Sequence, residues 1–387
     1  MPKKPGYYCA LIATLLAGIV VVLGAYTRLA DAGLGCPDWP GCYGFLTVPT
    51  SEDDINQAQL RYPEAPVEVH KGWPEMVHRY FAGSLGILIL ALAVYCYRNR
   101  HHENQPVKLP IAILILVILQ AAFGMWTVTL KLWPQVVLAH LIGGFTTFSL
   151  LFLLTLRLKE KSSSSRQNKT SAISPQNTHH NHSSTMTVRA NQTDTLAKAK
   201  MLGVGALFIL ICQIMLGGWT SSNYAALACI DLPTCHNTYW PEMDFASGFN
   251  LLQEIGPNYL GGQLDSSART AIHFTHRMGA IITTFYLLFL ILWIKQKLLP
   301  SLSSQRKRIR NTLLLVFAAL CLQISLGVSN VIWLLPLSIA VAHNAGGALL
   351  LLSSILLCYR LFQINNNKQY NSINLHEMSN STGEFTP

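Results

Sequence analysis

Charged residues are scarce in this chain. Of its 387 residues only 12% are Asp, Glu, Lys or Arg, whereas 51% are hydrophobic. A soluble domain usually carries about 25% charge. The mean hydropathy is also positive. These values exclude a soluble enzyme, a disordered chain and a fibrous protein, and they are typical of a chain that crosses a membrane several times.

A cleavage site is also missing after the first apolar run, residues 9–26, so we expect this run to be a span and not a removable signal peptide. The apolar runs lack the alternation of barrel strands, which favours helices. Eight runs are long enough for a bilayer of about 30 Å. They lie at 8–28, 76–97, 109–130, 135–156, 201–220, 272–294, 312–332 and 336–360.

The net charge of the chain is +10, and its positive and negative residues fall mostly on opposite sides of the predicted membrane. Most lysines and arginines fall in the segments that share a side with the N-terminus, and the two long loops opposite, about 30–74 and 221–270, carry most of the acids. The positive-inside rule then places both termini in the cytoplasm. We expect a multi-pass protein of the bacterial inner membrane and no nucleic-acid partner.

Polar, low-complexity composition sets the predicted domain boundaries. Residues 160–198 are predicted to be a disordered cytoplasmic linker and 365–387 a polar cytoplasmic tail. The linker histidines His179, His180 and His182 fit low-complexity drift better than a metal site. The remaining parts, 1–159 and 199–364, are each expected to form a half with four spans.

The two halves resemble each other in three blocks. GAYTRLADAGLGCPDWPGC (24–42) aligns without a gap with GGWTSSNYAALACIDLPTC (217–235), and similar matches join 74–86 to 269–280 and 119–144 to 322–347. Each half has an even number of spans, so the repeat is parallel. The predicted fold class is all-α, a polytopic membrane protein with eight transmembrane helices as two parallel-repeat four-helix bundles.

Four histidines lie inside spans at repeated positions: His78, His140, His276 and His343. Ionisable residues in spans are costly and usually functional. Each is expected within the first two turns of its span, all near the outer face. Two facing imidazoles can hold the axial positions of a haem. Hydrogen bonds to backbone carbonyls are the structural alternative, and zinc or copper would need other ligands beside the histidines.

Charged neighbours distinguish the two histidine pairs. Arg79 and Arg277 each follow a histidine and are placed either to bind haem propionates or to reach the interface. Glu75 precedes His78 by three residues, whereas the aligned residue in the second half is His273. Glu75 is either a proton-transfer group or an acid that stabilises the first turn of its helix. The sequence leaves both pairs of alternatives open.

Two cysteine pairs, Cys36 with Cys42 and Cys229 with Cys235, follow odd-numbered spans on the expected outer side. That compartment is oxidising, so we favour structural disulfides over labile pairs that exchange thiols during turnover.

The E-x-x-H-R motif of residues 75–79, the other three span histidines, H-R at 276–277 and C-x-D-W-P-x-C at 36–42 together resemble the haem A synthase family of cytochrome c oxidase assembly proteins. The resemblance implies an enzyme that oxidises the C8 methyl of haem O to a formyl group. It also implies a substrate haem on His78 and His140 beside Glu75, and haem b as cofactor on His276 and His343.

The resemblance further implies haem O synthase as the upstream donor and an electron donor or acceptor that the sequence does not identify. A homo-oligomer stays open, and His70, His236 and His273 receive no role. The competing interpretations are a bis-His dihaem electron carrier and, less favoured, a transporter with a parallel repeat. Two histidine ligands leave no open position for oxygen, so either one ligand leaves or the oxidation proceeds by electron removal and water attack.

Overall fold

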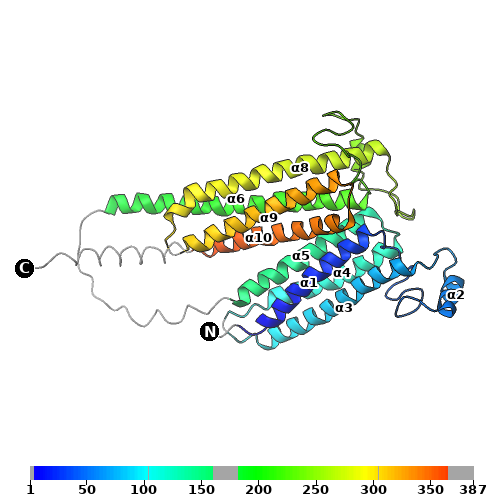
Figure 1. The fold of residues 1–387 in the computed structure, drawn as a ribbon. Coiled ribbons are helices and arrows are strands. Elements are labelled where there is room, and N and C mark those ends of the chain that lie inside the picture. Colours follow the sequence, from blue (N-terminus) through cyan, green and yellow to red (C-terminus); the bar gives the residue numbers. More distant parts are fainter. Residues whose placement is uncertain (1–3, 103, 160–181, 304, 365–387) are drawn as a thin grey trace, which may run out of the picture. The chain divides into compact units, whose positions relative to one another are not determined.

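The structure is a computed structural model that describes residues 4–102, 104–159, 182–303 and 305–364. Within these residues it is all-helical, without a β-strand (Figure 1). The long helices are α1 (Tyr7–Leu29), α3 (Val69–Arg98), α4 (Lys108–Thr129), α5 (Pro134–Lys159), α6 (His182–Ser222), α8 (Ser266–Trp293), α9 (Arg306–Ile332) and α10 (Leu337–Phe362). The short ones are α2 (Glu52–Arg61) and α7 (Phe245–Gly248), and a π-helical turn, Ile294–Leu298, continues α8.

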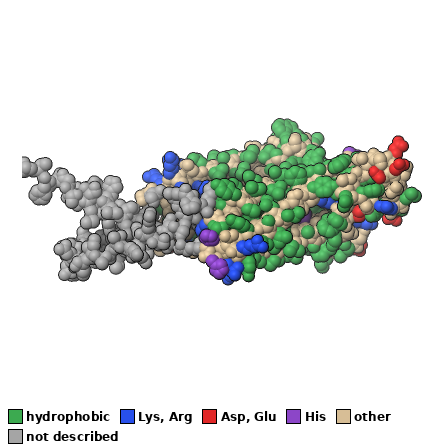
Figure 2. Space-filling view, turned by 90° about the horizontal axis from the view of Figure 1, so that it is seen from below, with side chains coloured by type: hydrophobic (Ala, Val, Ile, Leu, Met, Phe, Trp, Pro, Cys, Tyr) green, Lys and Arg blue, Asp and Glu red, His purple; other side chains and the backbone are tan. Residues whose placement is uncertain are grey.

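Eight of these helices are long and apolar enough to cross a membrane. This confirms the predicted number of spans and the all-α membrane fold. Large hydrophobic side chains such as Ile87 and Phe208 are 72% and 68% exposed, and hydrophobic side chains cover much of the face seen in Figure 2. Such a surface suits contact with lipid, since monomeric soluble proteins rarely expose large apolar patches.

The described residues fall into two compact units. One lies within 1–167, 212–280 and 323–348, and the other lies within 168–211, 281–322 and 349–387. The four span histidines, the neighbouring Glu75 and both cysteine pairs belong to the first unit. The division into repeat halves at 1–159 and 199–364 stays a prediction.

The four helices α1, α3, α4 and α5 pack side by side in the first unit (Figure 1). Ala10, Ala13 and Ala17 form a small-residue stripe on α1 and are fully or almost fully buried, which lets neighbouring helices approach closely. Leucines and isoleucines of α3, α4 and α5 complete this core. A hydrogen bond between the hydroxyls of Thr14 and Thr155 (3.0 Å) links α1 to α5.

Four of the long helices, α3, α6, α8 and α9, begin earlier than their apolar runs predicted, and two of them carry a span histidine. α3 begins at Val69 and α8 at Ser266, where residues 76 and 272 were expected. The added turns are polar in part, and in α3 they pack against the first long loop: Gly72 faces Val48, and Met76 joins a cluster around Cys36. The expectation that all four histidines lie within two turns of the helix start is therefore wrong for His78 and His276. It is right for His140 and His343.

The structure describes only part of the predicted linker, residues 182–198. Residues 160–181 and the tail 365–387 lie outside the described residues. Residues 182–198, which we expected to be disordered, are helical, because α6 begins at His182 and runs into its apolar span without a break.

Replacing Leu154 with Ala tests the packing of the first core. Leu154 is fully buried, so the cavity should cost about 2–5 kcal/mol of unfolding free energy. The matched control, Leu15→Ala on α1, removes a side chain that is 64% exposed and should cost less than about 0.5 kcal/mol. Thermal unfolding of the purified protein in detergent measures both, and equal losses would contradict this packing.

Candidate functional site

His78 of α3 and His140 of α5 face each other within the first unit. Their ring centroids lie 6.5 Å apart and the ring planes are almost perpendicular, at 87°. Two metal–imidazole bonds of about 2 Å each, together with the two ring radii, give a separation of this size. The predicted pairing of these histidines is thus present in the geometry.

Three of the four span histidines have an Nδ1 atom without a hydrogen-bond partner in the described part of the chain. The Nδ1 atoms of His78, His140 and His343 are buried and have no hydrogen-bond partner among the described residues. Backbone groups of Val20, Gln120 and Gln323 lie near the rings of His78, His140 and His343, respectively. An Nδ1–H directed at a carbonyl is the usual partner of a histidine that ligates metal through Nε2.

His276 of α8 and His343 of α10 form the second pair, and their rings lie close enough for a charge on one to act on the other. Two glutamine amides contact it: Gln213 Nε2 lies 3.1 Å from His276 Nδ1, and Gln323 Nε2 lies 3.3 Å from His343 Nε2. Gln323 belongs to the repeat, but Gln213 aligns with Val20, so the repeat gave no signal for Gln213. These contacts would have to yield where a metal takes the same nitrogen.

A glycine on a neighbouring helix faces each histidine. A Cβ atom added to Gly24, Gly124, Gly217 or Gly327 would lie 2.9, 3.4, 3.1 or 3.1 Å from the Cε1 atom of His78, His140, His276 or His343, respectively. Sequence reasoning missed this role, although all four glycines stand at repeated positions. Other glycines near the histidines in sequence behave differently: Gly143, Gly279 and Gly346 make room for glutamine side chains, and a Cβ at Gly83, Gly86 or Gly144 meets nothing within 4 Å.

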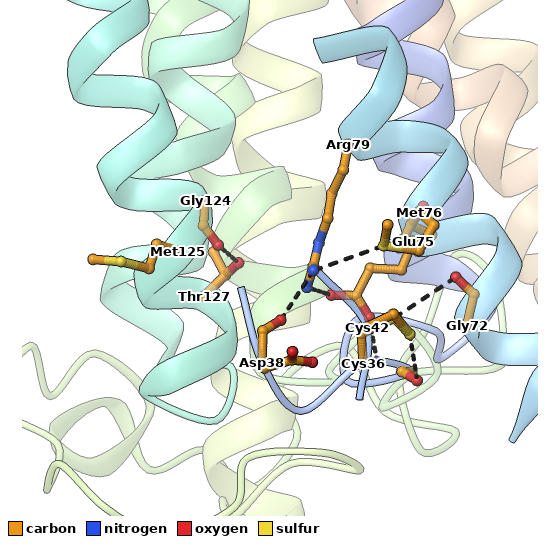
Figure 3. A network of polar contacts seen from close by, with 12 residues as sticks. Cys36, Asp38, Cys42, Gly72, Glu75, Met76, Arg79, Gly124, Met125 and Thr127 are labelled. Atoms are coloured by element: carbon orange, nitrogen blue, oxygen red, sulfur yellow. Dashed lines mark hydrogen bonds and ion pairs between the residues drawn. A yellow bond between two sulfur atoms is a disulfide. The ribbon is translucent and has the colours of Figure 1, made fainter. Parts of the chain in front are cut away.

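A salt bridge within α3, between Arg79 and Glu75, is hydrogen-bonded to the first disulfide loop (Figure 3). Arg79 Nη2 donates to Glu75 Oε1 at 2.5 Å, and the backbone N–H of Cys36 donates to Glu75 Oε2 at 3.0 Å. Arg79 Nη1 donates to the carbonyls of Asp38 (2.9 Å) and Gly41 (2.5 Å). Glu75 therefore does not stabilise the first turn of its own helix, which begins at Val69; it fixes the loop to the helix.

The second loop repeats this arrangement with a different partner. Arg277 Nη1 donates to the carbonyls of Asp231 and Thr234, both at 2.9 Å, and Nη2 donates to Cys229 O at 2.6 Å. The Cys229 N–H lies 3.2 Å from His273 Nδ1, where the first loop uses a carboxylate. His273, to which the sequence assigned no role, thus occupies the place of Glu75.

The cysteines are bonded as predicted, Cys36 to Cys42 and Cys229 to Cys235. All four are almost completely buried, which favours a structural role over thiol exchange, because labile pairs are exposed. Arg79 and Arg277 both bind loop carbonyls, so neither is simply reaching for the membrane interface. Binding of haem propionates by these arginines stays a prediction.

In each disulfide loop an aspartate carboxylate accepts hydrogen bonds from two backbone N–H groups of the same loop. Asp38 accepts the N–H groups of Tyr43 (2.6 Å) and Gly44 (2.8 Å), and Asp231 accepts those of His236 and Asn237, both at 2.9 Å. The Thr234 hydroxyl and these amides lower the pKa of the Asp231 carboxyl to about 2. Sequence reasoning treated the aspartates only as part of the repeated motif.

These residues fit a haem better than a bare metal ion. No group of three or more His, Cys, Asp or Glu side chains suited to a metal ion occurs in the described part of the chain. What occurs instead is a facing histidine pair, buried ring nitrogens without partners, and glycines that keep the space beside each ring open. A macrocycle that supplies four equatorial nitrogens needs only the two axial ligands.

Comparison with known proteins agrees with this geometry. The sequence profile of a family described as cytochrome oxidase assembly protein matches residues 7–355. This chain belongs to that family. The resemblance noted in the sequence is thereby confirmed over nearly the whole chain.

Several curated relatives of the family are heme A synthases. That of Shewanella oneidensis is 44% identical over 91% of this chain and 94% of its own length. Those of Chelativorans sp. and Sinorhizobium medicae are 26% and 27% identical, over 87% and 92% of this chain and 85% and 89% of their own.

Gly24→Ala tests the space beside His78. The added methyl would lie 2.9 Å from the ring, a contact that must displace the imidazole, so the protein should lose haem from the site of His78 and His140. Gly83→Ala is the control, because its Cβ meets nothing within 4 Å. Haem content is measured by absorbance per chain after purification. Equal haem content in the two variants would contradict the claim that Gly24 keeps space open beside His78.

Proposed function

We propose that this protein is a haem A synthase, an enzyme that oxidises the C8 methyl of haem O to a formyl group. In this proposal His78 and His140 hold the substrate haem, and His276 and His343 hold haem b. The haem would supply redox chemistry at its iron; the chain supplies histidine ligands and a positioned carboxylate. The observation that carries the proposal is the His78–His140 pair, with ring centroids 6.5 Å apart and Glu75 one turn before His78.

Glu75 is the candidate catalytic residue. Its two oxygens accept N–H groups from Arg79 and Cys36, so the carboxylate is fixed at the loop end of α3. A carboxylate fixed in this way can take up a proton as the methyl group is oxidised. His273 stands in its place in the second half, which supports the division into a reacting site and an electron-holding site.

The membrane setting of the proposal follows from charge. Lysines and arginines concentrate on the side of the N-terminus, which places both termini in the cytoplasm and the disulfide loops outside the bacterial inner membrane. Haem O synthase is the proposed donor of substrate. The reaction also needs an electron donor or acceptor, and self-association stays open.

Production of the full chain in cells that make haem O but no haem A tests this function. Extraction and chromatography of the membrane haems should reveal haem A in cells with this chain and none in cells without it. A folded, membrane-inserted chain that yields no haem A would refute the proposed activity.

Glu75→Gln should leave haem bound but lower haem A formation by about 100-fold, the size of effect typical of a lost acid–base group. The amide keeps a hydrogen bond to Cys36 but cannot take up a proton. Glu68→Gln, which alters the exposed N-cap acid of α3 that is paired with Lys71, is the control. Unchanged haem A formation in Glu75→Gln would reduce Glu75 to a structural residue.

His78→Ala should release the substrate haem and leave most of the haem b, because only the first pair loses a ligand. The ratio of haem O plus haem A to haem b, measured by chromatography of the purified protein, reports this difference. His70→Ala, near the start of the same helix but outside the pair, should not alter the ratio. Equal loss of both haems from His78→Ala would contradict the assignment of sites.

A further inference from the structure

Arginines at equivalent positions, Arg79 and Arg277, hold the two disulfide loops in the same way. The two sites differ by the one negative charge of Glu75. Arg79 is paired with the carboxylate of Glu75, whose side chain is only 5% exposed. Arg277 binds only carbonyl oxygens and the His273 ring, and no carboxylate lies within salt-bridge distance of it in the described residues. One Nη2 atom thus meets a carboxylate in the first half and a carbonyl in the second.

The His273 ring is neutral in this arrangement. Its Nδ1 faces the N–H of Cys229 at 3.2 Å and its Nε2 faces the Nε–H of Arg277 at 3.3 Å. An imidazolium has no lone pair with which to accept either hydrogen, whereas a neutral ring can accept one of them. His273 therefore holds the loop without neutralising the guanidinium.

The loop aspartates do not restore the balance. Asp38 and Asp231 occupy equivalent positions and both direct their carboxylates at backbone N–H groups of their own loops. Their charge is the same in both halves. The difference between the halves is therefore the replacement of Glu75 by His273.

We propose that this difference decides which haem stays and which exchanges, an inference that rests on the proposed function. Arg277, next to the ligand His276, lacks the directly paired carboxylate that Arg79 has, so its guanidinium attracts an anionic haem propionate more strongly. Arg79, next to His78, is already neutralised by Glu75, and its attraction for a propionate is weaker. The second half then retains its haem as a resident cofactor, while the first half releases its haem as a product must be released.

Two substitutions with opposite expected effects test the proposal. His273→Glu gives Arg277 a carboxylate and should speed release of haem b about tenfold, while Glu75→Gln frees Arg79 and should slow release of the substrate-site haem about tenfold. His273→Gln, which stays neutral and keeps an acceptor, is the matched control and should release haem b at the wild-type rate.

The measurement is haem transfer from the purified full-length protein to excess apomyoglobin. Samples are taken over time, and chromatography of the haem left on the protein separates haem b from haem O and haem A. In the wild type the substrate-site haem should leave faster than haem b.

Opposite changes in the two variants would support the proposal. Faster release from both variants would overturn it, because that result means that Glu75 and His273 only keep the loops folded. An unchanged rate in either variant would overturn it as well. If the wild type forms haem A but the variants show such contradicting release rates, this inference is refuted and the proposed function stands. If the wild type forms no haem A, the proposed function itself is refuted.

Discussion

An arginine on the helix that carries a histidine ties each disulfide loop to that helix, and the rest of the site depends on this tie. Arg79 binds the Asp38 and Gly41 carbonyls, and Arg277 binds those of Asp231 and Thr234. A guanidinium offers five donors in a rigid plane, so one side chain can hold several carbonyls of a tight loop.

Under the proposed function, duplication followed by divergence would let one architecture serve two tasks. Both halves keep the histidine pair, the facing glycines, the disulfide and the loop aspartate. They differ where Glu75 becomes His273 and where Val20 becomes Gln213. Both changes lie near a span histidine, and both place a neutral hydrogen-bonding group in the second half. Such changes alter the local charge and hydrogen bonding while the histidine pair of each half is kept.

Much of this architecture could be predicted from the sequence, for identifiable reasons. Spans follow from apolar length, and His78, His140, His276 and His343 stand out because ionisable residues in spans are rare. The helix starts at Val69 and Ser266 could not be predicted, because their first turns pack on loops and not in lipid. The carbonyl partners of Arg79 and Arg277 were also hidden, since backbone acceptors leave no trace in residue identity. Gln213 escaped notice because its counterpart, Val20, is apolar.

The identity and number of haems on the purified protein test the account most directly. Haem extracted from the intact chain, separated by chromatography and identified by mass, should amount to two per chain: one haem b, and one haem O or a product of its oxidation. Two molecules of haem b per chain would instead indicate an electron carrier. A folded protein without haem would contradict the interpretation of all four histidines.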